Sequence, residues 1–514
     1  MTIGVLLRCG CLQERRIANG ARVRCRRSIL PIAAAAISAV LFAAGCMVGP
    51  GYERPQTLAD TNTPYFNAAG HSQDVNALEQ MDHWWQSFGD QVTGDLVRRA
   101  LENNYDLQVA AARVLEAQAI FEQNTGARLP QVSYDLSRDR SKRSFNLGGF
   151  AGGGRFSVMS TTWQQAFSVS YILDLFGKLR RSQRAAWNDL LAAQANQEAV
   201  VNSLIAAVIK TRTDIATLQR RLDIENANIN SQKQTLAVVE RRYRLGLVGP
   251  LDVRRERENL ARTQTSRYTI ELSLATARNA LDVLLGARPG SSQPLPATLP
   301  ELPDPGPVPV GVPAALLDRR PDIKAAEFAL RAANERVGVS IAALLPDVTL
   351  TGQWGRSGDT WEELWRSDTE IYSAITGLAQ PIFQGGRLRA RVKAEKARYQ
   401  QAARQYAATV LKALREVEDA LASERLLRRQ LEQAQLRVRQ ATAAARLARE
   451  RYARGLENIL TVLDSERQKQ SAEDQLAVLK GSLWAARVNT LLALGGYWYD
   501  ETKLAASKGR NDEP

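Results

Sequence analysis

Two stretches of this 514-residue chain, residues 178–245 and 387–454, contain neither glycine nor proline over 68 residues each. Glycine and proline are the residues that most often mark the end of a helix, so each stretch predicts one uninterrupted α-helix. At a rise of ~1.5 Å per residue, such a helix would be ~100 Å long, whereas helices of globular domains average about three turns. The chain is therefore expected to be mainly α-helical, and it is not an ordinary globular domain.

The chain also contains an internal repeat, and each copy holds one of these stretches. Residues 104–113 align with residues 320–329 at an offset of 216, and residues 242–246 align with residues 451–455 at an offset of 209. The seven extra residues of the first copy fall in the glycine-rich segment 147–154, where a loop tip tolerates insertion. These features divide the chain into a leader (1–45), an N-terminal segment (46–90), a first repeat (91–288), a strap with nine of the 19 prolines (289–313), a second repeat (314–495) and a C-terminal tail (496–514).

The long stretches carry a heptad pattern on one face only. In the first stretch six aliphatic residues recur at steps of seven, but the second seam that a coiled coil requires is mostly polar. A narrow apolar stripe predicts a helix that packs laterally against other helices in a single layer and leaves one face exposed to water. If the helices stood alone, a two-stranded coiled coil would be the simpler interpretation. The stripe is Val201, Val208, Ile215, Leu222, Ile229 and Leu236, and the polar seam is Ile205, Arg212, Gln219, Asn226 and Lys233.

A pair of candidate strands precedes each long helix, near 130–141 and 162–173 in the first repeat and near 346–356 and 371–382 in the second. The first three alternate polar and apolar residues, whereas the fourth alternates poorly. Such alternation is typical of membrane β-barrel strands, and also of a half-buried sheet in a soluble protein. Four strands cannot close a barrel, and each unpaired backbone group in lipid costs several kcal/mol. If the strands cross a membrane, the chain must oligomerise. Because an eight-stranded barrel is filled by its own side chains, a conduit requires at least three copies.

The N-terminus has the organisation of an export signal. Four arginines between residues 22 and 27 precede an apolar run, 29–44, that is too short to predict a membrane helix. The run ends in Ala43-Ala44-Gly45-Cys46, which resembles the processing site of bacterial lipoproteins, although Ala43 stands where leucine is usual. The resemblance implies a covalent lipid on Cys46 and, from Met47, the outer membrane. The alternative is a plain signal peptide followed by an incidental cysteine.

The composition argues against several classes of protein. From residue 46 onward the only cysteine is Cys46, which excludes an internal disulfide framework, and two histidines leave little material for a metal site. No nucleophile, metal cluster or phosphate-binding loop stands out, so an enzyme is not expected. The net charge is +14, and without the leader, which has seven arginines and one acid, it falls to +8 (61 − 53). That charge is too dispersed to indicate nucleic-acid binding.

Six short segments, in this order along the chain, are similar to those of the outer-membrane efflux lipoproteins, the TolC-like outer-membrane factors of tripartite pumps (NodT/OprM type). Each string is weak by itself, and the similarity rests on their order over the whole chain after the leader. The segments are Cys46-Met-Val-Gly-Pro-Gly-Tyr-Glu-Arg-Pro55, Trp84-Trp85 with Phe88, Asp174-Leu-Phe-Gly177, Arg319-Arg-Pro-Asp-Ile323 followed by Ala326-Glu327, Pro381-Ile-Phe-Gln-Gly-Gly-Arg387 and Leu494-Gly-Gly496.

The resemblance implies a fold, partners and a function. It implies a homotrimer in which a 12-stranded β-barrel in the outer membrane continues as a 12-helix α-barrel across the periplasm, with an equatorial belt formed by the termini and the strap. A periplasmic adaptor and an inner-membrane transporter would be its partners, and small toxic compounds its cargo. Two alternatives stay open: an outer-membrane duct for protein secretion, and a periplasmic coiled-coil adaptor, which should have one hairpin rather than two.

The tips where the long helices turn back are the expected contact with the adaptor. Gly246 and Gly455 occupy corresponding places and suit a tight helix reversal. Leu247 and Leu456 follow them as candidate contact residues.

Acidic residues just after the tips are the candidates for a periplasmic aperture. By resemblance, Asp252 in the first repeat and Asp464 in the second match positions that narrow the closed tube, whereas Thr461 stands where the equivalent of Asp252 would be. We hypothesise that a ring of these carboxylates attracts cations. The alternative is that they form ordinary salt bridges with Arg254, Arg255 or Arg467 on their own helices.

Overall fold

The computed structural model describes residues 47–56, 65–67, 85, 88–146, 155–291, 295–296 and 316–496. All of them belong to a single structural unit that begins at Met47. The leader with Cys46, the glycine-rich segment 147–154, most of the proline-rich strap and the tail after Gly496 lie outside the described residues.

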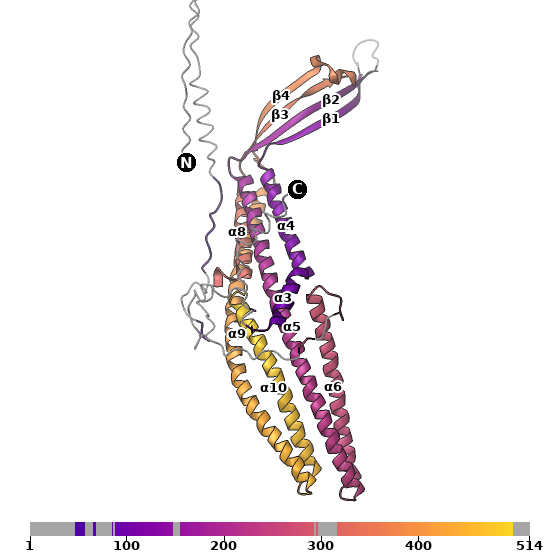
Figure 1. Cartoon of the computed structure of the whole chain (residues 1–514). Coiled ribbons are helices and arrows are strands. Elements are labelled where there is room, and N and C mark those ends of the chain that lie inside the picture. Colours follow the sequence, from indigo (N-terminus) through magenta and orange to yellow (C-terminus); the bar gives the residue numbers. More distant parts are fainter. Residues whose placement is uncertain are drawn as a thin grey trace, which may run out of the picture. The chain divides into compact units, whose positions relative to one another are not determined.

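Two long helices dominate the chain (Figure 1). Helices α5 (Lys178–Arg244) and α9 (Arg387–Ala453) are 67 residues long, and both agree with the sequence-based limits to within one residue. In each half a 22-residue helix precedes the strands and a 35-residue helix returns from the tip. The remaining α-helices of the described chain with more than one turn are α3 (Gln91–Asn103), α4 (Tyr105–Gly126), α6 (Pro250–Leu284), α8 (Pro321–Ala342) and α10 (Ile459–Ala493).

In the segment before α5, Asp174 and Gly177 each have a structural role at the start of the helix. The Asp174 carboxylate accepts hydrogen bonds from the backbone N–H groups of Leu179 and Arg180, at 3.1 and 2.9 Å. These donors have no partner within the helix, so the carboxylate caps it. Gly177 has a φ of 76°, a left-handed conformation that favours glycine, and lets the chain turn from strand to helix.

The four strands form one antiparallel sheet in the order β1-β2-β3-β4. Tyr134 pairs with Phe167, Phe167 with Trp354 and Trp354 with Tyr372, so one face carries an aromatic row across all four strands. In this sheet β1 and β4 each have one neighbour, and both edges are unpaired. The strands are β1 (Gln131–Asn146), β2 (Arg155–Leu173), β3 (Asp347–Gly358) and β4 (Glu370–Ala379).

Strands β1 and β2 are longer than the sequence predicted. They have 16 and 19 residues, whereas the patterning indicated about 12. The ladder with β3 covers β2 only from Trp163 to Leu173. Beyond Trp163, β1 and β2 continue as a two-stranded ribbon, where charged residues on β1 had hidden the alternation.

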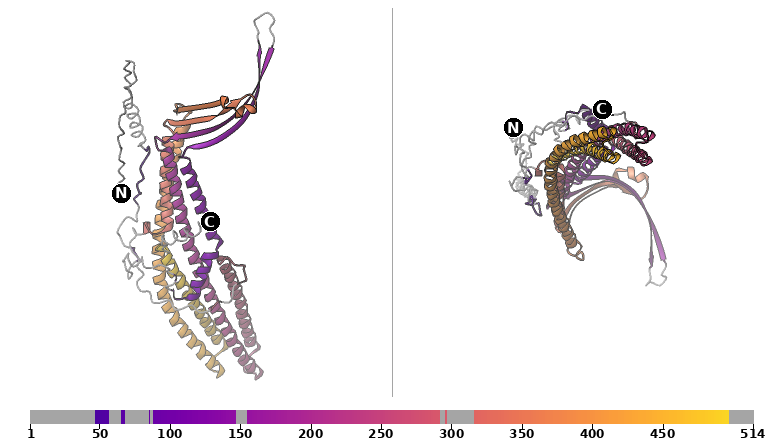
Figure 2. Two further views of the ribbon diagram at one scale, coloured as in Figure 1. Left: turned by 45° about the horizontal axis from the view of Figure 1, so that its top comes forward. Right: turned by 90° about the horizontal axis from the view of Figure 1, so that it is seen from below.

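The helices pack as a curved layer in which each long helix lies beside its returning helix (Figure 2). Helix α5 also contacts α3, α4, α8 and α10, and this corrects the prediction of one wet face for the first part of the polar seam. Further along the same seam, Lys233 is exposed as predicted. Ile205 and Arg212, which belong to the seam expected to be polar and exposed, are fully buried, as are Val208 and Ile215 of the apolar stripe. Helices from both halves cover them, which a one-helix pattern does not reveal. No helix in the described ranges is both long enough and apolar enough to cross a membrane.

Candidate functional site

Both helical hairpins reverse through the same backbone motif. At the end of α5 the Leu247 N–H donates to the Arg242 carbonyl and the Gly246 N–H donates to the Tyr243 carbonyl, both at 2.9 Å. This is a Schellman motif, which needs a left-handed residue after the helix, and Gly246 supplies it with a φ of 72°. The same two bonds end α9 at Gly455, whose φ is 77°.

The tips expose apolar side chains to solvent. Leu247 is 63% exposed and Leu456 is 64% exposed, so the two adaptor-contact candidates protrude. Neighbouring leucines add to them, which makes an apolar surface typical of a protein contact. These neighbours are Leu245, Leu251 and Leu460.

One arginine ties the two hairpins together just above the tips. The guanidinium of Arg242 on α5 lies over the ring of Tyr452 on α9, 4.6 Å from its centroid, and also donates a hydrogen bond to the Tyr452 carbonyl. A cation over an aromatic face combined with a charge-assisted hydrogen bond is among the stronger polar contacts at a partly buried site. Sequence reasoning missed this contact, although the arginine–tyrosine pair that ends each long helix was a visible signal.

The aperture residues have different surroundings. Asp464 forms an ion pair with Arg467 one turn further along α10, which is the salt-bridge alternative. Asp252 lies in the first turn of α6, where the helix dipole favours a carboxylate. Burial raises the pKa of Tyr452, the charge of Arg242 opposes this, and the charge of Asp252 adds to the rise. Among the residues that the structure describes, Asp252 has no ion-pair partner. Thr461 donates to Glu457 and Asn458, and its N–H is capped by Asn458.

A buried acidic pair lies deeper between the hairpins. Glu256 on α6 is fully buried, and neither carboxylate oxygen has a hydrogen-bond partner among the described residues. Burial, and after it the charge of Glu466, raises the pKa of Glu256 to about 8. Glu466 on α10 is also buried, which raises its pKa, but it contacts Arg449 at 3.4 Å and Thr235 at 3.3 Å. The pattern of α6 gave no signal for this pair, since Glu256 lies in an arginine-rich stretch.

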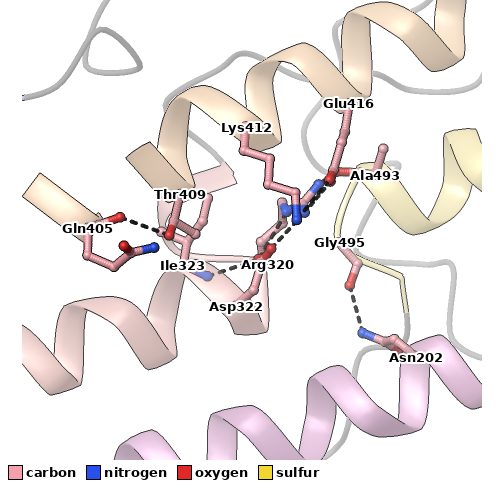
Figure 3. A network of polar contacts seen from close by, with 10 residues as sticks. All are labelled: Asn202, Arg320, Asp322, Ile323, Gln405, Thr409, Lys412, Glu416, Ala493 and Gly495. Carbon is pink, nitrogen blue, oxygen red and sulfur yellow. Dashed lines mark hydrogen bonds and ion pairs between the residues drawn. The ribbon is translucent and has the colours of Figure 1, made fainter. Parts of the chain in front are cut away.

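The Arg319-to-Ile323 segment is a junction of three helices (Figure 3). The buried Arg320 side chain donates to the Ala493 carbonyl at 3.0 Å, to Asp322 at 2.7 Å and to Glu416 at 2.6 Å. It thus joins the start of α8 to α9 and to the end of α10. In the same view, Asn202 on α5 donates to the Gly495 carbonyl at 3.2 Å.

Glu327, which follows the Arg319-to-Ile323 segment in the sequence, holds the N-terminal segment against α8. The buried carboxylate accepts from Tyr52 at 3.1 Å, from Arg54 at 2.7 and 3.1 Å and from Arg331 at 2.6 Å. Further up, the Val48 N–H donates to the Phe176 carbonyl at 3.2 Å. Val48, two residues after Cys46 in the sequence, is therefore held at the junction between β2 and α5.

Similarity to known proteins assigns the chain to a protein family. A family model described as outer membrane efflux protein matches residues 96–287 and 312–496. The chain belongs to that family. The matched ranges contain both hairpins and all four strands, so the tips, the acidic pair and the three-helix junction lie inside them.

Relatives of this outer membrane efflux protein support the same assignment over nearly its whole length. The toluene efflux pump outer membrane protein TtgF of Pseudomonas putida is 31% identical over 465 residues, which cover 88% of this chain and 94% of TtgF. Outer membrane protein OprJ of Pseudomonas aeruginosa is 31% identical over 489 residues, 92% of this chain and 98% of OprJ. The solved structure of the outer-membrane channel OprN matches with a TM-score of 0.79 at 31% identity, covering 88% of this chain and all of OprN. The protein is therefore an efflux channel of the outer membrane whose helices extend into the periplasm.

Proposed function

We propose that three copies of the chain assemble into a channel with a 12-stranded β-barrel and a 12-helix α-barrel. The observation that carries this proposal is the four-stranded sheet with two unpaired edges and one aromatic, apolar face. In lipid each edge would leave its backbone groups without partners, and pairing β1 of one copy with β4 of the next satisfies both edges. Helices α5, α6, α9 and α10 supply four helices per copy to the tube below.

The channel works in a tripartite pump that exports small toxic compounds. TtgF carries the name of a toluene efflux pump, which supports cargo of this size and polarity. The exposed leucines at the tips receive the periplasmic adaptor, and an inner-membrane transporter supplies the cargo. A covalent lipid on Cys46 anchors the chain, and the fastening of Val48 to Phe176 supports this because it holds residue 48 where the strands meet the helices.

The tips narrow the closed tube. The Arg242–Tyr452 contact joins the two hairpins of one copy, and the offset of 209 places Arg451 and Tyr243 at the equivalent positions. Both are exposed in a single chain. In the trimer, Arg451 of one copy would lie over Tyr243 of the next and repeat the contact around the ring. Asp252 contributes the charge of the aperture, and Asp464 less, because Arg467 neutralises it. Loss of cation selectivity in Asp252→Ala but not in Asp464→Ala channels is the expected result.

Assembly and transport are tested separately. Outer membranes from cells that make the full chain should yield, without heating, a band of three times the chain mass, and the purified band should conduct in planar bilayers. Leu247→Glu combined with Leu456→Glu should keep the trimer and the conductance but abolish resistance to toluene in a deletion strain. A monomer that needs no detergent would contradict the barrel, and resistance that survives the double substitution would contradict the adaptor contact.

A further inference from the structure

Three basic residues lie on one face of β1, the first level with the last residue of β3 and the other two on the ribbon beyond it. Arg138, Arg140 and Lys142 occupy alternate positions along β1, and all three are exposed. Alternate residues of a strand point to the same side, about 6.6 Å apart. They therefore extend the face that carries Tyr134 and Leu136, away from the helices.

No carboxylate of the described residues forms an ion pair with this basic ladder, which we define as Arg138, Arg140 and Lys142. Their partners across the strand pair are Trp163, Thr161 and Met159, none of which is charged. Asp139 lies between them in sequence but points to the opposite face of the ribbon. Within the described ranges none of the three forms an ion pair. Three uncompensated cations on one face are complementary to an anionic partner.

Indole rings lie at the inner end of the ladder. The Arg138 guanidinium lies 5.1 Å from the centroid of the Trp163 ring. Trp361, from the β3–β4 connection, packs on Trp163 at 5.2 Å, and Trp365 on Trp361 at 6.2 Å. The Leu364 carbonyl accepts a hydrogen bond from Gln165 at 2.8 Å, which fixes this connection to the same face. Tryptophan gathers where hydrocarbon meets polar headgroups, so the cluster marks that level on the sheet.

We infer that the basic ladder binds the phosphate groups of the phosphorylated glycolipid in the outer leaflet. This rests on the proposed barrel, because that assembly turns the aromatic face toward lipid and the ribbon toward the cell exterior. A lipid fits better than a free anion, because the ladder continues directly into the apolar face at Leu136 and Tyr134, where acyl chains would lie. Each lysine or arginine near an anionic headgroup adds attraction that salt weakens.

The test is lipid retention by the full-length, detergent-purified assembly, measured by native mass spectrometry with added bisphosphorylated lipid A. Replacing Arg138, Arg140 and Lys142 by serine should lower the lipid-bound fraction at least tenfold. The matched control likewise removes three exposed cations, in this case all arginines: Arg143→Ser on the opposite face, with Arg241→Ser and Arg244→Ser at a tip. It should change the lipid-bound fraction less than twofold. Raising NaCl from 50 to 500 mM should weaken binding to the unaltered protein.

Three results would overturn the inference: undiminished binding by the triple variant, equal binding of dephosphorylated lipid A, or equal competition by phosphatidylglycerol. The unheated gel band serves as the independent readout of assembly. If the unaltered chain forms no heat-sensitive oligomer in membranes, the barrel itself is wrong. If it does and lipid A still fails to bind, only the assignment of the ladder is wrong.

Discussion

Arg320 donates a 3.0 Å hydrogen bond to the carbonyl of Ala493, so the N-cap residue of α8 contacts the last residue of α10. The other half has the same connection with different chemistry: Asn104, which caps α4, donates to the Leu284 carbonyl at the end of α6, also at 3.0 Å. A helix C-terminus leaves carbonyls without partners, and each half satisfies one of them from the start of another helix. These two bonds join the ends of the two returning helices, α6 and α10, to the starts of α4 and α8.

Substituting Arg320→Ala should destabilise this junction. The substitution leaves the Ala493 carbonyl without its donor and removes the cation between Asp322 and Glu416. The expected loss in the free energy of unfolding is about 3 kcal/mol, measured by denaturant titration of helical circular dichroism in detergent. Arg366→Ala removes an exposed ion pair with Asp368 and serves as the control, and it should leave the free energy of unfolding essentially unchanged because solvent screens that pair. Equal effects of the two substitutions would contradict a special role for Arg320.

Glu327→Ala should release the N-terminal segment from α8. The carboxylate is the shared acceptor for Tyr52 and Arg54, and without it both donors lose their buried partner. We expect hydrogen exchange in residues 47–56 to accelerate at least tenfold, measured by mass spectrometry of peptides from the native assembly. Asp318→Ala removes only the exposed partner of Arg54 and should leave exchange nearly unchanged. Unaltered exchange in the Glu327 variant would show that other contacts hold the segment.

Glu256 should make stability depend on pH. Its pKa is about 8 in the folded protein against an ordinary value of 4.5, so the fold favours the neutral acid. The stabilisation is complete below pH 4.5 and is lost as the pH rises toward 8, by up to about 1.4 kcal/mol per pH unit. Glu256→Gln should flatten this decline and raise the thermal midpoint at pH 8. Glu258→Gln, on the exposed face of the same helix, is the control and should keep the slope of the unaltered protein.

Breaking the Arg242–Tyr452 contact should widen the tips. Arg242→Ala removes the cation over the ring and the bond to the Tyr452 carbonyl, a loss of about 2 kcal/mol per copy. The conductance of single channels in planar bilayers should rise several-fold. Tyr452→Phe keeps the ring and the carbonyl, so it should behave like the unaltered channel, as should Arg244→Ala. A closed Arg242→Ala channel would mean that other contacts hold the hairpins together.

Several features were readable from the sequence because they depend on local chemistry. The long helices run between glycines, and Gly177 and Gly246 gave the limits of α5 to within one residue because their positive φ suits helix ends. Three of the four strands were located by alternation, but β1 and β2 were predicted too short. On β1 the reason is that Arg138, Arg140 and Lys142 replace apolar residues on the same face. A local pattern thus locates a helix or strand, but it fails to predict the part of that element where the residues on one face change from apolar to charged.

The contacts that define the site depend on elements distant in sequence. Arg212 and Ile205 are buried because helices of both halves surround α5, although their own heptad seam indicated a wet face. Glu256 meets Glu466, and Arg242 meets Tyr452, only because the two hairpins lie side by side. By itself, the sequence determined the elements, the tips and the family resemblance. Only the tertiary structure decided which side chains are buried and paired. Burial and charge coupling depend on neighbours some 210 residues away, and the periodicity of a single helix or strand contains no information about them.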